Sequence, residues 1–409
     1  MGYIALLDMG FIWRLATPTK EDREKPDKTK YTWGDYSDKL HDIVLRRHPN
    51  AETLILVNDP YTSEYSIKDA EKLRRSKGPV PNVFISAEKE FPCNQTFNVL
   101  MSKPENKTRL QSFLRDRFAK SSSKQTLKYT VVGGYFRNLT TNRDEPAYLC
   151  HHAEADTAQF TIISKLIENG CAQPFVIDTE DTDNYMHAFY VANKINGSLL
   201  IKRKNKFINA KQLTDPCMVD IIIPFYMLTG DDHNSGFYDR GKKLIHDRIM
   251  YSHDSRLLLE SVGDSLDMSE ETAKDMSTFV IKYVYNDHDS DTLAEARAVY
   301  WHSRGKRKLL RWPPDEESMQ LHALRCNYLA YIYKNFHLLD HPDPVGNGWH
   351  LQDGLCLPVK PQNPALPQHV PIDNNEEPDD SESEEDTDSD SSSSDNFESS
   401  DDDTLPDLS

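Results

Sequence analysis

The stretch QPFVIDTEDTDNYMHAFYVANK, residues 173–194, decides the expected fold because it passes from strand to helix through a cluster of acids. Its apolar start, 174–177, is typical of a buried strand, and 184–194 has the pattern of a helix. Asp178, Asp181 and Asp183 place three aspartates within six positions between them. Like charges this close raise one another's pKa unless a cation or a basic group lies among them. The stretch therefore predicts a counter-charge at the carboxyl end of a strand.

The same alternation of strand and helix patterns extends through the first half of the chain. Further strands are expected at 3–7, 53–57, 127–132 and 198–201, and further helices at 35–47, 68–75, 109–118 and 154–167. This alternation predicts an α/β fold, in which a mostly parallel central sheet carries helices on both faces. In such sheets the functional crevice lies beyond the carboxyl ends of the strands.

Acidic side chains recur at the ends of these elements. The candidate site residues are Asp8, Asp59, Glu154, Asp156, Asp181, Asp183 and Asp232. Magnesium takes oxygen ligands and is held by a few carboxylates together with water and substrate phosphate. Two such ions about 3.5–4 Å apart can hold both the attacking and the leaving oxygen of a phosphodiester. The expected counter-charge is therefore a pair of Mg²⁺ or Mn²⁺ ions.

The order and local context of these acids resemble the flap-endonuclease/XPG branch of the PIN-like nuclease family, over about residues 1–250. The resemblance is carried by Leu6-Leu-Asp8, Leu54–Asp59 before a Lys/Arg helix, Ala153–Asp156, Thr179–Asp183 and Leu228–Asp232. It implies a metal-dependent nuclease that hydrolyses DNA or RNA, with water as the nucleophile. It also implies that all seven acids are catalytic metal ligands, the first four mainly at one ion and Asp181, Asp183 and Asp232 at the other.

A later part of the chain carries a second resemblance. Trp312-Pro-Pro-Asp and Gly346-Asn-Gly-Trp349 are similar to uncharacterised animal and mobile-element proteins that have the same nuclease-like region. The chain departs from the flap-endonuclease pattern at Asp239-Arg240-Gly241, which keeps only the second glycine of a Gly-x-Gly hairpin.

Clustered cations are expected to hold the nucleic-acid backbone. The candidates are Lys68, Lys72, Arg74, Arg75, Lys242 and Lys243. For the basic runs 202–206 and 304–308, a backbone contact and a solvated face both remain open, and Lys306-Arg-Lys308 also fits a nuclear import signal. The expected role of His151, His152 and His233 is that of polar loop residues or phosphate contacts, since no Cys/His spacing supports zinc.

Four of the acids also have an ordinary explanation, whereas charges that end buried strands, as at Asp8 and Asp59, are rarely there for packing. Asp181 or Asp183 would cap the helix that starts near 184, and Glu154 and Asp156 suit the first turn of a helix. The alternative function is accordingly a catalytically inactive PIN-like module that binds nucleic acid or protein.

Four regions are expected along the 409 residues: a nuclease domain at 1–250, a helical extension at 251–340, a Pro-rich irregular segment at 341–372 and an acidic tail at 373–409. The tail holds 17 of the 66 Asp and Glu and no Lys or Arg, which leaves 49 acidic against 48 basic residues elsewhere. With almost nothing to bury, the tail is expected to be disordered. It would bind a basic protein partner, mask a basic groove or simply aid solubility.

Cellular location is also suggested by the sequence. The six cysteines are scattered without C-x-x-C spacing, which favours reduced thiols. No segment has the pattern of a signal peptide or a membrane span. The expected protein is soluble and intracellular, in the nucleus or the cytoplasm with the nucleus favoured, and it has no membrane partner.

Overall fold

The computed structural model describes residues 2–23, 30–60, 65–75, 80–92, 96–120, 127–132, 135–138, 143–144, 150–204, 206–304 and 311–363. All of these belong to a unit formed by residues 1–367. The predicted acidic tail and the basic stretch 306–308 lie outside the described residues.

The described strands form an eight-stranded sheet in the order β5-β4-β3-β2-β1-β6-β7-β8. They are β1 (Tyr3–Asp8), β2 (Ala51–Val57), β3 (Leu127–Val132), β4 (Tyr135–Asn138), β5 (Arg143–Asp144), β6 (Phe175–Asp178), β7 (Leu199–Arg203) and β8 (Lys206–Asn209). The strands β3, β2, β1, β6 and β7 pair in parallel. The remaining three extend the edges by antiparallel pairing, and no prediction from the sequence included these edge strands. The α/β class and the mostly parallel sheet are confirmed.

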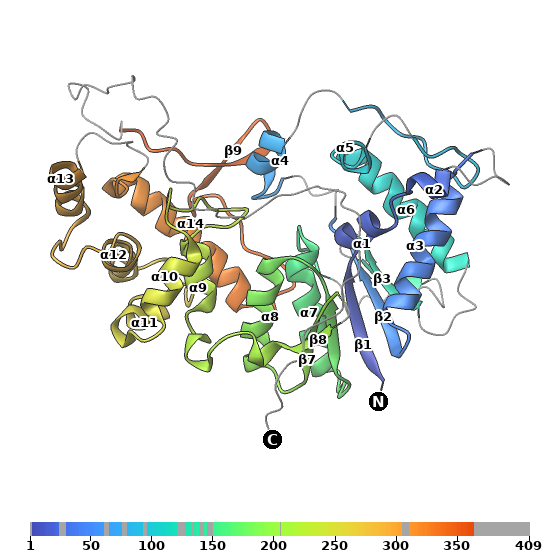
Figure 1. Cartoon of the computed structure of the whole chain (residues 1–409), viewed down its shortest axis with the longest axis horizontal. Helices are drawn as coiled ribbons and strands as arrows, with labels where there is room; N and C mark the ends of the chain where they lie inside the picture. The colour runs from blue at the N-terminus through green and yellow to red at the C-terminus, as the bar shows by residue number, and fades with distance from the viewer. Residues whose placement is uncertain are drawn as a thin grey trace. The chain divides into compact units, whose positions relative to one another are not determined.

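Helices cover both faces of the sheet, as predicted. Successive side chains of a strand point to opposite faces, so Ala5 and Leu7 of β1 pack in one layer and Ile4 and Leu6 in the other. The helices of the first layer are α1 (Met9–Leu15), α3 (Trp33–Arg47) and α6 (Pro104–Lys120). Those of the second are α7 (Ala155–Glu168) and α8 (Thr182–Lys194). Figure 1 shows the two layers on either side of the sheet.

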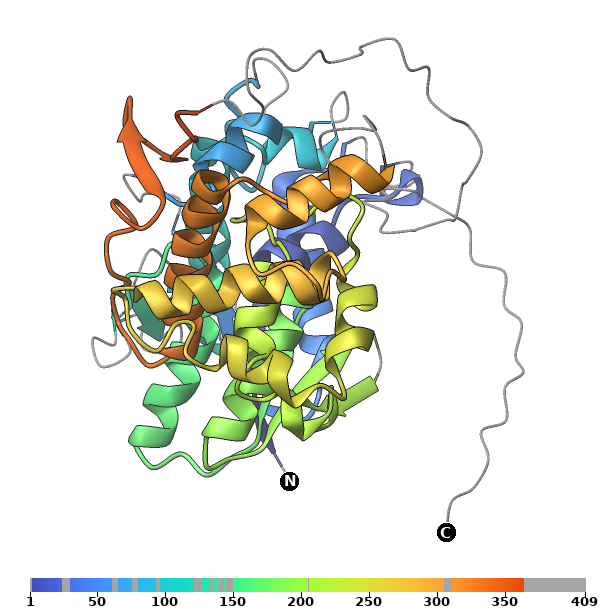
Figure 2. The same cartoon turned by 90° about the vertical axis from the view of Figure 1, so that its left-hand side faces the viewer.

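The chain after β8 is mainly helical and shares the core of the second layer (Figure 2). Its helices are α9 (Ile222–Leu228), α10 (Lys242–Ile249), α11 (His253–Glu260), α12 (Glu270–Phe279), α13 (Leu293–Arg304) and α14 (Glu316–Lys334). Two buried histidines connect α14 to this layer. The imidazole of His187 donates to the Tyr333 carbonyl oxygen at 3.0 Å, and that of His322 donates to the Leu228 carbonyl oxygen at 2.8 Å.

The shorter helical segments are α2 (Lys20–Arg23), α4 (Asp69–Arg75), α5 (Phe97–Leu100), a π-helical turn (Val280–Val284) and two 3₁₀ turns (Ala210–Gln212 and Pro216–Met218). No helix within the described ranges is long and apolar enough to cross a membrane.

A two-stranded hairpin lies in the segment that was expected to be irregular. It consists of β9 (Trp349–Gln352) and β10 (Leu355–Pro358). Its turn residues Asp353 and Gly354 have positive φ angles of 53° and 76°. An Asp-Gly pair is the typical sequence of a two-residue turn with this geometry. The Cys356 amide donates to Asp69 Oδ2 at 3.2 Å, which attaches the hairpin to α4.

The strand order reverses at the boundary between β1 and β6. From β1 the sheet continues to β2 on one side and to β6 and β7 on the other. Such a reversal leaves a crevice beyond the carboxyl ends of the two strands. The register sets Asp8 opposite Val57 and Leu7 opposite Asp178. The acids that follow β1, β2 and β6 therefore leave the sheet at one edge.

Candidate active site

The first two candidate acids end neighbouring strands. Asp8 closes β1, and its Oδ1 accepts a hydrogen bond from the Gly10 amide at 2.8 Å, which caps α1. Asp59 follows β2 by two residues, and its Oδ1 accepts from the Ala155 amide at 2.8 Å. Gln111 Nε2 donates to the Asp59 carbonyl oxygen at 2.7 Å. Asp59 thus satisfies a free amide at the start of α7 and holds that helix against the strand ends.

Glu154 and Asp156 come with the start of α7. Glu154 occupies the N-cap position but makes no side-chain capping bond, so the ordinary capping role does not account for its carboxylate. It lies 3.0 Å from the ammonium of Lys68. Asp156, in the first turn, accepts a hydrogen bond from Asn184 Nδ2 at 2.7 Å, which connects α7 to α8.

The acids after β6 belong to the start of α8. Asp181 accepts a hydrogen bond from the Asp183 amide at 3.0 Å, so the capping role that the sequence left open is present. The Asp183 carboxylate accepts a hydrogen bond from the hydroxyl of Tyr226 on α9. Asp178 is paired elsewhere, with Arg47, and is described further below.

A largely buried ammonium group lies among these acids. Lys68 Nζ lies 3.0 Å from Glu154 Oε2 and 4.0 Å from both Asp156 Oδ2 and Asp232 Oδ2. Burial opposes its charge, but the attraction of Glu154 and Asp156 outweighs burial, so the pKa of Lys68 lies well above its ordinary value. Lys68, predicted as a nucleic-acid contact, therefore links the loop after α9 to the acids of α7.

His233 is a second cation in the crevice. Its Nδ1 lies 3.1 Å from Asp231 Oδ2, and its Nε2 lies 3.2 Å from Glu154 Oε2. Burial lowers the pKa of His233, but Glu154 and Asp231 outweigh it and raise the pKa to about 10. The imidazole is therefore protonated at neutral pH and donates to both carboxylates. Burial alone would raise the pKa of Glu154, yet Lys68 and His233 hold it below its ordinary value.

Three other acids are not fully neutralised by nearby cations, and their pKa values are raised. Burial, followed by repulsion from Asp59 and Asp181, raises the pKa of Asp8 to about 7. Burial also raises the pKa of Asp156, where Lys68 opposes the shift and Asp8 adds to it. The pKa of Asp183 is raised to about 6 by burial and by Asp181. Acids from separate strand and helix ends thus act on one another in a single crevice.

The donor set of the crevice suits a hard divalent cation. It offers carboxylate oxygens, and burial leaves part of their negative charge uncompensated; this is the chemistry that Mg²⁺ and Mn²⁺ prefer. In the conformation described, and within the described ranges, no three His, Cys, Asp or Glu side chains have the spacing of a formed metal site. The residues that would hold such ions are Asp8, Asp59, Glu154, Asp156, Asp181, Asp183 and Asp232.

The predicted nucleic-acid contacts on α4 are engaged with acids of the same helix. Lys72 Nζ lies 3.2 Å from Asp69 Oδ1, and Arg74 Nη2 lies 2.6 Å from Glu71 Oε1. Both basic side chains remain more than half exposed. The side chain of Arg75 lies outside the described part of the structure.

Two of the predicted contacts, Lys242 and Lys243, lie at the start of α10. Lys242 Nζ lies 3.4 Å from the centre of the Tyr226 ring, and the hydroxyl of the same tyrosine bonds to Asp183. Lys243 is exposed. Lys242 therefore brings a positive charge to the side of the crevice formed by Asp183.

A scan against protein-family models and a search of curated proteins found no match to this chain. The candidate site therefore rests on its geometry and chemistry.

Two residues of the crevice, Asn184 and Tyr226, were not predicted as site residues. Asn184 adjoins Asp183, so it was within reach of the same motif, and Asp231 belongs to the same acidic stretch as the predicted Asp232. Tyr226 had no such signal, because it reaches Asp183 only through the packing of α9 beside α8.

Proposed function

We propose that this chain is a metal-dependent nuclease with a PIN-like core, which hydrolyses phosphodiester bonds of DNA or RNA by a two-metal mechanism. The observation that carries the proposal is the gathering of the predicted acids at the strand-order reversal, where burial raises the pKa of Asp8, Asp156 and Asp183. Structural acids seldom accumulate in a buried crevice without matching cations.

The residues divide into two groups on this proposal. Asp8, Asp59, Glu154 and Asp156 would serve mainly one ion, and Asp181, Asp183 and Asp232 the other. Bound ions of this kind would activate the attacking water and stabilise the leaving oxygen.

Neighbouring side chains fix the directions of the acids. Lys68 and His233 hold Glu154 from two sides. Asn184 orients Asp156, and the Tyr226 hydroxyl orients Asp183. Such bonds fix the orientation of ligand side chains, and their loss typically costs about 10- to 100-fold in metal affinity or activity.

The decisive test uses the substitutions Asp183→Asn and Asp232→Asn, alone and together, with single-stranded and structured DNA and RNA in Mg²⁺ or Mn²⁺. We expect cleavage by the wild-type chain and a loss of about 100-fold or more in the double variant. Asp220→Asn is the matched control, because Asp220 is exposed and pairs with Lys194. If the wild type cleaves none of these substrates, or the double variant cleaves as fast, the proposal is wrong.

The second candidate function is a PIN-like module that binds nucleic acid or protein without catalysis. The ammonium of Lys68 favours it, because this cation supplies the crevice with an internal counter-charge. A thermal melt with and without Mn²⁺ separates the two functions. For the nuclease we expect a rise of several degrees in Tm, since ligand at 100 times its Kd adds about 2.7 kcal/mol to the free energy of unfolding. The module predicts no shift, and Asp183→Asn should reduce any shift that is seen.

The expected setting of this activity is also a proposal. We place the protein inside the cell, in the nucleus or the cytoplasm, where it would meet a nucleic-acid substrate. A basic protein partner for the acidic tail stays a prediction.

A further inference from the structure

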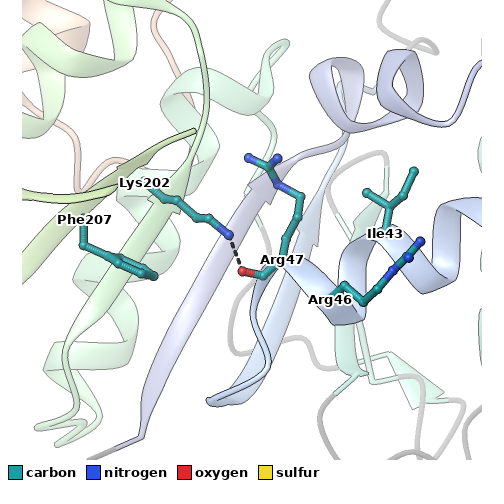
Figure 3. Close-up of a pocket in the computed structure, with 5 residues that line it drawn as sticks. All are labelled: Ile43, Arg46, Arg47, Lys202 and Phe207. Carbon is teal, nitrogen blue, oxygen red and sulfur yellow. Dashed lines mark hydrogen bonds between the residues drawn. The ribbon is translucent and has the colours of Figure 1, made fainter. Parts of the chain in front are cut away.

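An open cavity of about 340 Å³ lies between the end of α3 and the strands β7 and β8. Its lining residues are Ile43, Arg46, Arg47, Lys202 and Phe207 (Figure 3). The first three come from α3, and the other two come from neighbouring positions on β7 and β8. Phe207 is 49% exposed, so an aromatic ring is available to a ligand at this end of the sheet.

Three cations line this cavity, and among the described residues only Arg47 forms a salt bridge with a carboxylate. Arg47 donates to both oxygens of the buried Asp178, from Nε at 2.6 Å and from Nη2 at 2.5 Å. Lys202 donates to the carbonyl oxygen of Arg47, as the dashed line in Figure 3 marks, and Arg46 donates to the carbonyl oxygen of Asp42. Among the described residues, no carboxylate forms a salt bridge with Arg46 or Lys202.

Lys202 adds a positive charge at an unusual place. The residue is only 5% exposed, and its ammonium lies 5.9 Å from the centre of the Phe207 ring. Burial lowers the pKa of Lys202, although Asp178 opposes the shift. A half-open cavity with surplus positive charge and low-dielectric walls attracts anions.

Contacts near the cavity lead towards two of the candidate acids. Arg47 Cζ lies 5.5 Å from the centre of the Phe11 ring, and Phe11 belongs to α1, whose cap is Asp8. The Lys204 amide donates to Glu180 Oε1 at 3.4 Å, and Glu180 precedes Asp181. The cavity walls are therefore continuous with two of the segments that carry the candidate acids.

We propose that this cavity binds a segment of a single nucleic-acid strand, with one backbone phosphate beside Arg46, another beside Lys202, and a base against Phe207. The inference rests on the proposed nuclease function, since it assigns a place to the strand next to the acids. Phosphates bind clustered cations, and an exposed aromatic ring stacks on any base. An acidic peptide would match the cations but would leave the exposed ring without a partner.

The test is binding of a fluorescent single-stranded oligonucleotide of about 12 nucleotides, as DNA and as RNA, to the full chain. Anisotropy is measured in EDTA over a series of salt concentrations, so that binding is read without cleavage. The variants are Arg46→Gln and Phe207→Ala, alone and together; both side chains are exposed, and a circular-dichroism melt checks the fold. The control is Lys274→Gln, which changes an exposed cation on α12.

In a plot of the logarithm of the association constant against the logarithm of salt concentration, Arg46→Gln should reduce the slope by about 0.7. This is the value for one phosphate contact on a single strand. Phe207→Ala should weaken binding about 5- to 150-fold and leave that slope unchanged. Lys274→Gln should change neither quantity. Wild-type affinity and slope in the combined variant would overturn the proposal. So would binding of a poly-glutamate peptide that Arg46→Gln abolishes while oligonucleotide binding stays intact, because the cavity would then belong to an acidic protein segment.

Failure of the nuclease proposal gives a different result. In that case the wild type binds the oligonucleotide through Arg46 and Phe207 but cleaves nothing with Mn²⁺. Conversely, if Asp183→Asn abolishes cleavage while the cavity variants bind and cleave like the wild type, the nuclease stands and the cavity proposal falls.

Discussion

At the scale of single residues, the crevice is organised by a mismatch between acids and cations. Lys68 and His233 both contact Glu154, so this one carboxylate is neutralised twice. Asp8 and Asp183 receive neither cation within salt-bridge distance and have raised pKa values instead. A divalent ion relieves such repulsion because it contacts several carboxylates at once. On the proposed nuclease function, Asp8 and Asp183 would therefore gain most from bound metal ions, because neither is neutralised by Lys68 or His233.

The hydroxyl of Tyr226 offers a narrow test of how Asp183 is oriented. Tyr226→Phe removes one hydrogen-bond donor to Asp183 and leaves the ring beside Lys242 in place. We expect kcat to fall about 10- to 100-fold with little change in KM, because a misdirected ligand weakens the site and not the binding of substrate. Steady-state cleavage kinetics measure this. The control is Tyr251→Phe, since Tyr251 is 95% exposed, and a wild-type kcat in Tyr226→Phe would show that the bond does not orient Asp183.

At the scale of elements, the sequence predicted what depends on local pattern. Each strand of the parallel core was expected from its apolar run, for example 174–177 before β6. The long helices that cover the sheet, α3, α6, α7 and α8, were also expected, whereas the short helix α1 was not. The edge strand β8 was missed because its residues 206–209 are mostly exposed and show no buried apolar run. The strand is defined by its hydrogen bonds to β7, which a local pattern does not reveal. The β9–β10 hairpin was missed although Asp353-Gly354 is a turn signal, because the surrounding prolines suggested irregular structure.

The candidate site was predictable only in part, for a related reason. The acids at strand ends could be named because a parallel sheet brings the carboxyl ends of its strands to one edge. The contacts that pair them could not be named. Lys68 reaches Glu154 across 86 residues of chain, and His233 reaches it across 79. A local sequence pattern cannot predict contacts between residues so far apart in the chain. The pairing of Lys68 and His233 with Glu154 therefore had to be taken from the folded structure.

The start of α7 shows how one acid serves both the fold and the site. Asp59→Asn keeps an oxygen that accepts from the Ala155 amide, whereas Asp59→Ala removes it. We expect Asp59→Ala to be less stable than Asp59→Asn by about 1 kcal/mol, the usual value of a helix cap, and cleavage to be lost in both. Urea unfolding without metal and a cleavage assay separate the two roles. Equal stability of the two variants would mean that this bond does not hold the helix start.

At the scale of the whole described unit, the candidate site depends on helices that are distant in sequence from the sheet. Asp231, Asp232 and His233 follow α9, and α9 is held in place by α14 through the bond from His322 to the Leu228 carbonyl oxygen. His187 of α8 makes the corresponding bond to Tyr333 of α14. The chain from 222 to 334 is therefore part of the support of the crevice, and truncation before α14 would expose the apolar side of α8 and α9.

These two histidines make the stability of the unit depend on pH. Burial lowers the pKa of His187 to about 3 and that of His322 to about 4, with a further small reduction of the former by His152. Both imidazoles are thus neutral in the folded chain, whereas in the unfolded chain they take up protons below about pH 6.5. Each contributes stability that is present above pH 6.5 and is lost as the pH falls towards the folded pKa. We expect a loss of about 2 kcal/mol per histidine between pH 7 and pH 5.

Comparison of variants isolates this effect from the carboxylates, which also titrate in that range. In His187→Phe the ring still packs between Phe160 and Tyr333, but the titrating group is absent. The free energy of unfolding, measured with urea at pH 7, 6 and 5, should therefore fall less steeply with pH in His187→Phe than in the wild type, whatever its value at pH 7. A His253→Phe variant, which changes the first residue of α11, should keep the wild-type dependence. If the free energy of unfolding falls equally with pH in His187→Phe and in the wild type, His187 does not stay neutral in the folded chain. Its bond to α14 would then not explain the loss of stability in acid.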